Sequence, residues 1–218
     1  MKPGLQPALR QRIRETTTQA ILAAAEEVFA NKGLHDAHMS EIASLAGVAV
    51  GTVYNHFADR DALLAGLLEA RRTEMRERID EALGNVTSPA TTPTGFRDRL
   101  RAFLLAVLTH KQEHRALGRF FQILMQGEIG RYQETFPSAC HVPTATLQEV
   151  FTRLDKLMKQ GVRARALRAD IADLAPVLFM GMIRSIMIRD TFVKVDGNAD
   201  LLSDAERLLT FFLQGAGT

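Results

Sequence analysis

Features that would set this chain apart from ordinary globular proteins are largely missing from its sequence. Cys140 is the only cysteine, so no disulfide can form within the chain, and we expect a reducing compartment. No apolar run approaches the length of about 20 residues that a membrane-spanning helix needs, and the N-terminus lacks a signal-peptide pattern. We therefore expect a cytoplasmic protein with no membrane partner.

Motifs of catalysis are also absent. No glycine-rich phosphate loop, nucleophile elbow or Ser/His/Asp order stands out, so we predict that the chain is not an enzyme and needs no cofactor. An unrecognised enzyme stays open as an alternative, which turnover on a broad substrate panel would support.

Two histidines form the one arrangement that permits a metal site. His110 and His114 are four residues apart and therefore share a face of a predicted helix, while Cys140 and His141 lie elsewhere in the chain. Because these residues do not form a tighter cluster in the sequence, we predict no metal site.

Charge is unevenly distributed along the 218 residues. The chain has a net charge of +2, but residues 1–85 carry ten Lys/Arg against twelve Asp/Glu, and residues 86–218 carry seventeen against thirteen. The N-terminal part is thus not basic as a whole, although Lys2, Arg10, Arg12 and Arg14 all precede the first acid, Glu15. The hydrophobic content of 46% is enough for a sizeable core, in one large or two small domains.

Helical periodicity dominates the chain, and no segment shows the period-2 pattern of a strand. We expect an all-α fold of about nine helices, near residues 10–31, 39–46, 50–56, 59–83, 96–114, 115–127, 144–160, 173–195 and 201–214. Gly, Pro, Ser and Thr concentrate in residues 84–95, which predicts a linker. We divide the chain into a flexible basic arm (1–9), an N-terminal domain with its linking helix (10–83) and a C-terminal domain (84–218).

The segment from residue 38 to residue 64 has the pattern of a helix-turn-helix. The first helix has an apolar side, and we expect the helix to end at Gly47. Glycine enters the left-handed backbone conformation of a tight turn without steric cost. In the next helix Val53 and Phe57 can face inward, which leaves Thr52, Tyr54 and their neighbours outside. Two short helices joined by such a turn place the second helix in a DNA major groove.

This segment resembles the DNA-binding domain of the TetR family of bacterial regulators. The matching residues are Glu41-Ile42-Ala43, Ala46-Gly47-Val48, the run from Gly51 to Phe57, Arg60 to Leu64, and upstream Ile21 to Ala25 and Val28-Phe29 through Gly33. The resemblance covers roughly residues 10–70 and implies an N-terminal helix-turn-helix domain of three helices. It also implies a C-terminal helical domain that binds a ligand and dimerises.

The residues expected to contact duplex operator DNA lie mainly on the second helix of the motif. They are Ser40, Val50, Gly51, Thr52, Tyr54, Asn55, His56 and Arg60. Family members commonly have Ser or Thr where His38 stands, Arg where Ser40 stands and Lys where Val50 stands. With Val50 in place of that Lys, the second helix contains no Lys or Arg. The affinity for DNA is therefore expected to fall less steeply as the salt concentration rises. The alternative is an ordinary helical corner of a protein-interaction domain.

Three arginines before the first helix core offer a second contact with DNA. Arg10, Arg12 and Arg14 could enter a minor groove and compensate for the missing cations. The alternative, a solvated tail, stays open.

A ligand pocket is expected among apolar residues of the C-terminal helices, with plain core packing as the alternative for each. The candidates are Phe103, Val107, Phe120, Phe121, Leu124, Met125, Phe151, Leu154, Met158, Met180 and Ile183. Their character predicts a small, largely apolar effector, whose identity the sequence does not reveal.

A homodimer is expected through the last two helices, which are apolar on more than one side. The candidate interface residues are Leu178, Gly181, Ser185, Phe192, Leu201, Ala205, Leu208 and Phe212. The alternative is burial of these helices within one chain.

Together these features predict a ligand-responsive transcriptional regulator, most simply a repressor released from a palindromic operator by its effector. The alternative is a helical sensor or carrier of lipophilic ligands whose specific DNA binding is weak or lost.

Overall fold

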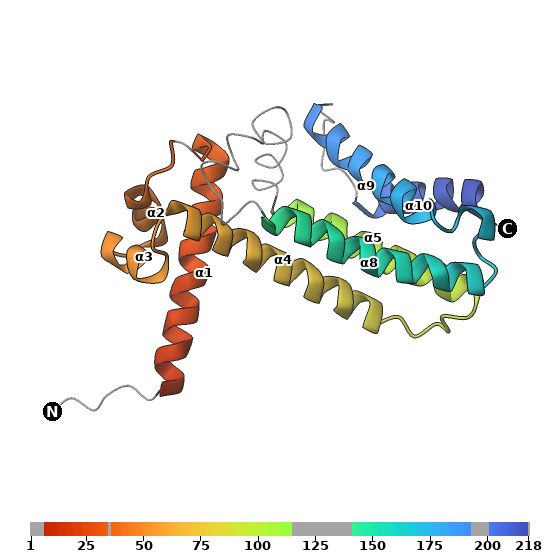
Figure 1. The fold of residues 1–218 in the computed structure, drawn as a ribbon, viewed down its shortest axis with the longest axis horizontal. Coiled ribbons are helices and arrows are strands. Elements are labelled where there is room, and N and C mark those ends of the chain that lie inside the picture. The colour runs from red at the N-terminus through yellow and green to blue at the C-terminus, as the bar shows by residue number, and fades with distance from the viewer. Residues whose placement is uncertain (1–6, 35, 115–140, 193–200, 218) are drawn as a thin grey trace. The chain divides into compact units, whose positions relative to one another are not determined.

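The computed structural model describes residues 7–34, 36–114, 141–192 and 201–217, and within them every regular element is helical (Figure 1). The elements are α1 (Pro7–Lys32), α2 (Met39–Ala46), α3 (Val50–His56), α4 (Arg60–Gly84), α5 (Pro93–Glu113), α8 (His141–Arg163), the 3-10 turn η2 (Ala169–Ile171), α9 (Ala175–Phe192) and α10 (Leu201–Ala216). The all-α fold class is confirmed. The helix expected near 115–127 lies outside the described residues.

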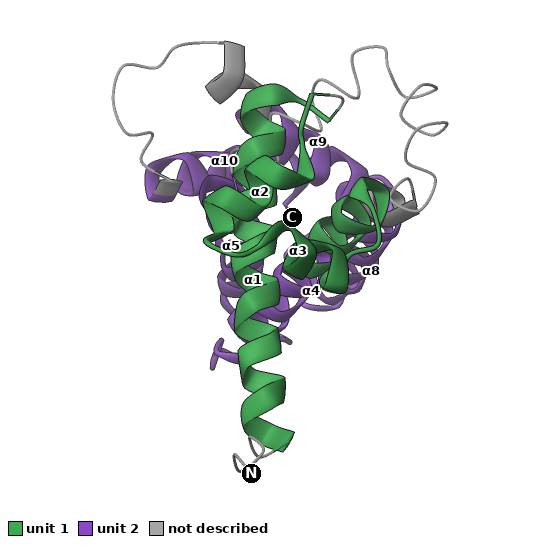
Figure 2. Ribbon diagram, turned by 90° about the vertical axis from the view of Figure 1, so that its left-hand side faces the viewer, with its two compact units in different colours: residues 1–71, 115–142 green, residues 72–114, 143–218 purple. Residues whose placement is uncertain are grey.

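The chain forms two compact units, shown in different colours in Figure 2. Unit 1 comprises residues 1–71 and 115–142, and unit 2 comprises residues 72–114 and 143–218. The division falls within α4, upstream of the boundary expected after residue 83. That boundary stays a prediction.

The core of unit 1 is built where α1, α2, α3 and the first turns of α4 meet. Ile21 and Phe29 of α1, Ile42 of α2, Val53 of α3 and Leu64 of α4 are all at most 2% exposed and belong to one apolar cluster. This cluster supports α3, because the helix is too short to be stable without tertiary packing.

In the core of unit 2, one face of each of its helices packs against the others. Its largest fully buried side chains include Phe96, Leu100 and Phe103 of α5 and Phe179 of α9. The rings of Phe179 and Phe212 meet edge to face, with centroids 4.9 Å apart, and so join α9 to α10. No helix among the described residues is both long enough and apolar enough to cross a bilayer.

Two helix ends differ from the sequence expectation. α8 continues through Gly161 to Arg163, and the chain reverses at Arg165, whose φ is 54°. A Cβ at Gly161 would lie 2.6 Å from the Phe96 ring and 2.9 Å from Leu167, so this glycine permits close packing and does not end the helix. α5 begins at Pro93, inside the expected linker, because Thr92 caps it by accepting a hydrogen bond from the Gly95 N–H at 3.1 Å.

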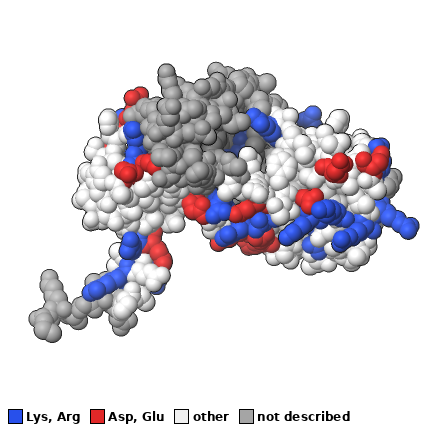
Figure 3. Space-filling model, in the orientation of Figure 1, with Lys and Arg blue, Asp and Glu red and all other residues white. Residues whose placement is uncertain are grey.

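Part of the expected flexible arm, residues 1–9, belongs to a helix, and residues 1–6 lie outside the described residues. Residues 7–9 already belong to α1, which extends well beyond α2 and α3 within unit 1 (Figure 1). Arg10, Arg12 and Arg14 are therefore exposed side chains of a helix, and Figure 3 shows basic side chains on this extension. Lys2 lies outside the described residues.

Candidate functional site

The turn between α2 and α3 has the geometry that its glycine predicted. Gly47 adopts φ 68° and ψ 29°, and its N–H donates to the Ser44 carbonyl at 3.2 Å while the Val48 N–H donates to the Ala43 carbonyl at 3.0 Å. These bonds close the end of α2 and direct the chain into α3. The two helices thus have the lengths and the connection of a helix-turn-helix.

The inner side of α3 is fixed by two apolar residues. Val53 is fully buried, and Phe57 packs against the core of unit 1 while its N–H donates to the Val53 carbonyl at 2.9 Å. A Cβ on Gly66 of α4 would lie only 2.6 Å from the Phe57 ring, so α4 approaches this ring closely. The orientation of α3 in unit 1 is therefore set by packing.

The outer side of α3 carries most of the residues expected to touch DNA. Tyr54 is 51% exposed and Val50 is 40% exposed, and Gly51 and Asn55 are exposed as well. Thr52 is half-buried, so it offers only part of its surface. This face contains a phenol, an amide and a hydroxyl, which suit phosphate oxygens and base edges, and no cation.

His56 is partly exposed, and its ring also contacts α1. Its Nδ1 lies 2.9 Å from the Thr18 Oγ1, so this ring nitrogen is engaged within unit 1. The Thr18 hydroxyl also donates to the Arg14 carbonyl at 2.9 Å. Sequence inspection missed Thr18 because it precedes His56 by 38 residues.

Replacing Thr18 with valine is expected to weaken operator binding about 3- to 10-fold, since loss of one hydrogen bond is worth about 1 kcal/mol and frees the His56 ring. Thr16→Val is the matched control, because the Thr16 hydroxyl bonds the Arg12 carbonyl at 3.0 Å on an exposed turn without meeting a histidine. Fluorescence anisotropy with operator DNA measures both variants. Equal affinities for the two variants would show that Thr18 does not position His56.

Ser40 and Arg60 flank the motif. Ser40 is exposed on the first turn of α2, as a phosphate contact requires. Arg60 is half-buried, and its Nη1 donates to the Ala37 carbonyl at 3.2 Å, so it also braces the segment before α2. Asp59 caps α4 by accepting from the Ala62 N–H at 2.8 Å, as its position predicted.

The start of α2 shows how the sequence departs from a strong cap. His38 occupies the N-cap position without a side-chain hydrogen bond to the helix. Nearby, the Lys32 ammonium donates to Glu41, and this hydrogen bond lowers the pKa of the Glu41 carboxyl. Lys32 is thereby committed to a carboxylate on α2.

The expected ligand-pocket residues lie mostly in the core of unit 2. Phe103, Leu154, Met158 and Ile183 are fully buried, Val107 is 4% exposed, and Phe151 and Met180 are half-buried. The hollow between α4 and α8 is lined instead by Arg72, Met75, Arg76, Ile79, Thr146, Glu149, Val150 and Arg153, and it is too narrow to hold a ligand. Phe120, Phe121, Leu124 and Met125 lie outside the described residues. The pocket stays a prediction.

The expected interface residues divide into two groups. Leu178 is 52% exposed, and Gly181 and Ser185 are exposed beside it on α9. Ala205, Leu208 and Phe212 are at most 5% exposed because they pack into the core of unit 2. They offer little surface to a partner, and the expected interface stays a prediction. The exposed apolar residues of α10 are Leu202 and Phe211, at 54% and 71%. The side chains of Phe192 and Leu201 lie outside the described residues.

Comparison with known proteins agrees with this geometry. Residues 21–67 match the family model described as "Bacterial regulatory proteins, tetR family". The chain is 25% identical over 206 residues to the transcriptional regulator AcrR of Shigella flexneri, a match that covers 92% of this chain and 89% of AcrR. It is 35% identical over 89 residues to the transcriptional activator FasR of Mycolicibacterium smegmatis, which covers 41% of this chain and only 37% of FasR.

A solved structure shares the fold over most of both chains. It is the regulator FadR from Bacillus subtilis in complex with stearoyl-CoA, with a TM-score of 0.70 and 23% identity. The superposition covers 90% of this chain and 98% of that chain. The similarity extends through both units and supports the fold.

Proposed function

Because this chain belongs to the TetR family of bacterial regulatory proteins, we propose that it binds a specific operator in duplex DNA and regulates transcription, most simply as a repressor. The observation that carries the proposal is the orientation of α3. Val53 and Phe57 anchor one side of this helix, while Tyr54, Asn55 and Gly51 are exposed on the other. A helix presented in this way can enter a major groove. We place this activity in the cytoplasm.

A homodimer is part of the proposal, because one helix-turn-helix reads too little DNA for specificity. Its support is an apolar surface on α9 and α10 with Val177, Leu178, Leu202 and Phe211 each more than half exposed. Exposed apolar side chains on two packed helices are of the kind that interaction sites use. A two-fold contact through it would pair the two copies of α9 and α10 and present two α3 helices to successive major grooves, about 34–36 Å apart.

The proposed effector is a small, largely apolar molecule bound by unit 2. The buried phenylalanine and methionine side chains of α5 and α8 support this choice. Long-chain acyl-CoA, of which the acyl chain is the apolar part, is the first compound to test, because the FadR structure contains stearoyl-CoA. Such a ligand can release DNA only if it binds the DNA-incompetent conformation more tightly than the competent one.

The test is fluorescence anisotropy with duplexes that tile the DNA upstream of the chain's own gene. One palindromic duplex is expected to bind two chains with at least about 10³-fold preference over scrambled DNA. Its affinity should fall less steeply with salt than that of a heavily basic reader, because α3 contains no Lys or Arg. Added stearoyl-CoA is expected to release the duplex.

The second candidate is a helical sensor or carrier of lipophilic ligands without specific DNA binding. The absence of Lys and Arg from α3 is the observation that favours it. Binding of every duplex with the same affinity at moderate salt would favour this candidate and contradict the regulator.

A further inference from the structure

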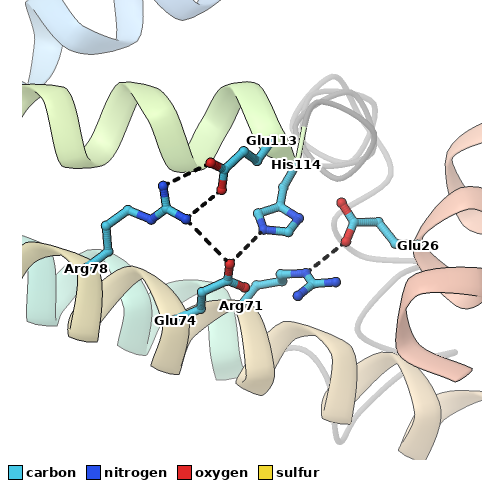
Figure 4. Close-up of polar contacts among 6 residues, drawn as sticks. All are labelled: Glu26, Arg71, Glu74, Arg78, Glu113 and His114. Carbon is cyan, nitrogen blue, oxygen red and sulfur yellow. Dashed lines mark hydrogen bonds and ion pairs between the residues drawn. The ribbon is translucent and has the colours of Figure 1, made fainter. Parts of the chain in front are cut away.

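Three potential metal ligands come together in unit 2, and one of them, Glu74, is distant in the sequence from the two histidines. Glu74 of α4 faces the last turn of α5, where His110 and His114 share one side of the helix (Figure 4 shows Glu74 and His114). One ligand atom of each residue lies within 4.8 Å of the others, and the His114 Nε2 is 3.3 Å from the Glu74 Oε1. The imidazole centroids of His110 and His114 are 4.6 Å apart.

The histidines are held in place by their helix. The His114 N–H donates to the His110 carbonyl at 3.0 Å, so the backbone keeps the two rings one turn apart. His110 is only 6% exposed, and its neighbours Ala106 and Val107 belong to the apolar core of unit 2. The site therefore has two ordered imidazoles at the edge of a core and one carboxylate from a second helix.

This donor set is one that Zn²⁺ prefers. Zn²⁺ binds imidazole nitrogen and carboxylate oxygen at about 2.0–2.2 Å, so tetrahedral ligands lie about 3.4 Å apart. The Glu74–His114 pair already has this separation. The remaining adjustment falls mainly to Glu74, whose side chain is 36% exposed and can change rotamer.

The surrounding charges allow a cation at this position. Arg78 lies 3.8 Å from the Glu74 Oε1, but its guanidinium is bound in a bidentate manner by Glu113 at 3.1 and 2.5 Å (Figure 4). Two carboxylates thus face one guanidinium, and Glu74 can turn toward a metal without breaking the Arg78–Glu113 pair. Metal binding would replace the longer Glu74–Arg78 contact and the Glu74–His114 hydrogen bond.

We propose that Glu74, His110 and His114 bind a divalent transition-metal ion of the Zn²⁺ type. Three protein ligands leave one coordination position for water or an anionic group. The spacing of the two histidines alone did not reveal a third ligand, whereas the fold places Glu74 of α4 beside them. Metal binding at this site does not depend on the proposed DNA-binding function.

The test measures metal binding by the full chain after treatment with a chelator. Isothermal titration with Zn²⁺ is expected to show one site per chain, and Co²⁺ in its place should give the intense visible absorption of four-coordinate geometry. Glu74→Gln and His114→Gln should each weaken Zn²⁺ binding by at least the roughly 100-fold that loss of an outer-shell partner can cause. Neither substitution touches the buried His110, so both variants should fold.

Glu77→Gln is the matched control, because Glu77 is an exposed carboxylate on the same helix, outside the cluster. It should bind Zn²⁺ as the unaltered chain does. Equal binding by all four proteins, or loss of binding only in Cys140→Ser, would overturn the proposal. The titration contains no DNA, so its failure would leave the operator proposal intact, and failure of the operator assay would leave the metal site intact.

Discussion

Replacing Tyr54 with alanine is expected to weaken operator binding by about 10- to 100-fold without a measurable loss of stability. Tyr54 is 51% exposed on the outer face of α3, so it contributes little to the core. A side chain that contacts phosphate or a base edge is worth about 1–3 kcal/mol, and each 1.4 kcal/mol is tenfold in affinity. The dissociation constant by anisotropy and the thermal midpoint of the same sample give the two quantities.

Two further variants sharpen this result. Tyr54→Phe removes only the hydroxyl and separates its hydrogen bond from the contact made by the ring. Leu147→Ala truncates a comparably exposed residue on α8, at 55%, and should leave DNA affinity unchanged. If Tyr54→Ala binds the operator as tightly as the unaltered chain, α3 is not the recognition helix.

The largest effect on stability is expected at the ion pair between Glu26 of α1 and Arg71 of α4. The Arg71 Nε donates to the Glu26 Oε2 at 2.8 Å, and the two side chains are only 14% and 10% exposed (Figure 4). Arg71→Met leaves the carboxylate in a poorly solvated position without its cation, which should cost about 3 kcal/mol of the free energy of unfolding. Urea denaturation and amide exchange in α1 measure this loss.

A double variant identifies the source of the cost. Replacing Glu26 and Arg71 together with methionine should recover most of the stability, because no charge is then desolvated. Lys32→Met is the matched control, since the Lys32–Glu41 pair is 50% and 36% exposed and should contribute much less to stability than the buried pair. A double variant as unstable as Arg71→Met would mean that lost packing, and not the buried charge, is responsible.

Loss of this ion pair should also weaken DNA binding. Glu26 belongs to the same helix as Thr18, which holds the His56 ring of α3. The packing of α3 against the core of unit 1 and the polar contact of its His56 therefore both depend on α1. Tyr54→Ala should lower the affinity for the operator and leave the free energy of unfolding unchanged, whereas Arg71→Met should lower both quantities.

The helix-turn-helix was predictable because its signals are local. The α2 and α3 ranges expected from periodicity and from Gly47 are those of the structure, since helix ends, left-handed turns and caps depend on neighbouring residues. Asp59 was predictable as a cap for the same reason. Gly161 was misinterpreted as a helix end because a local pattern cannot show a distant neighbour. In the fold this glycine allows the Phe96 ring to pack closely against α8.

By itself, then, the sequence determined the all-α class, the helix-turn-helix and the face of α3 that carries Tyr54 and Asn55. Only the tertiary structure decided which apolar faces are covered within the chain. In α10, Ala205, Leu208 and Phe212 are buried, whereas Phe211 is exposed. It also decided that Thr18 meets His56 and that Glu74 meets His114. Periodicity defines a helix face but not its neighbour, because contacts between helices depend on how the whole chain packs.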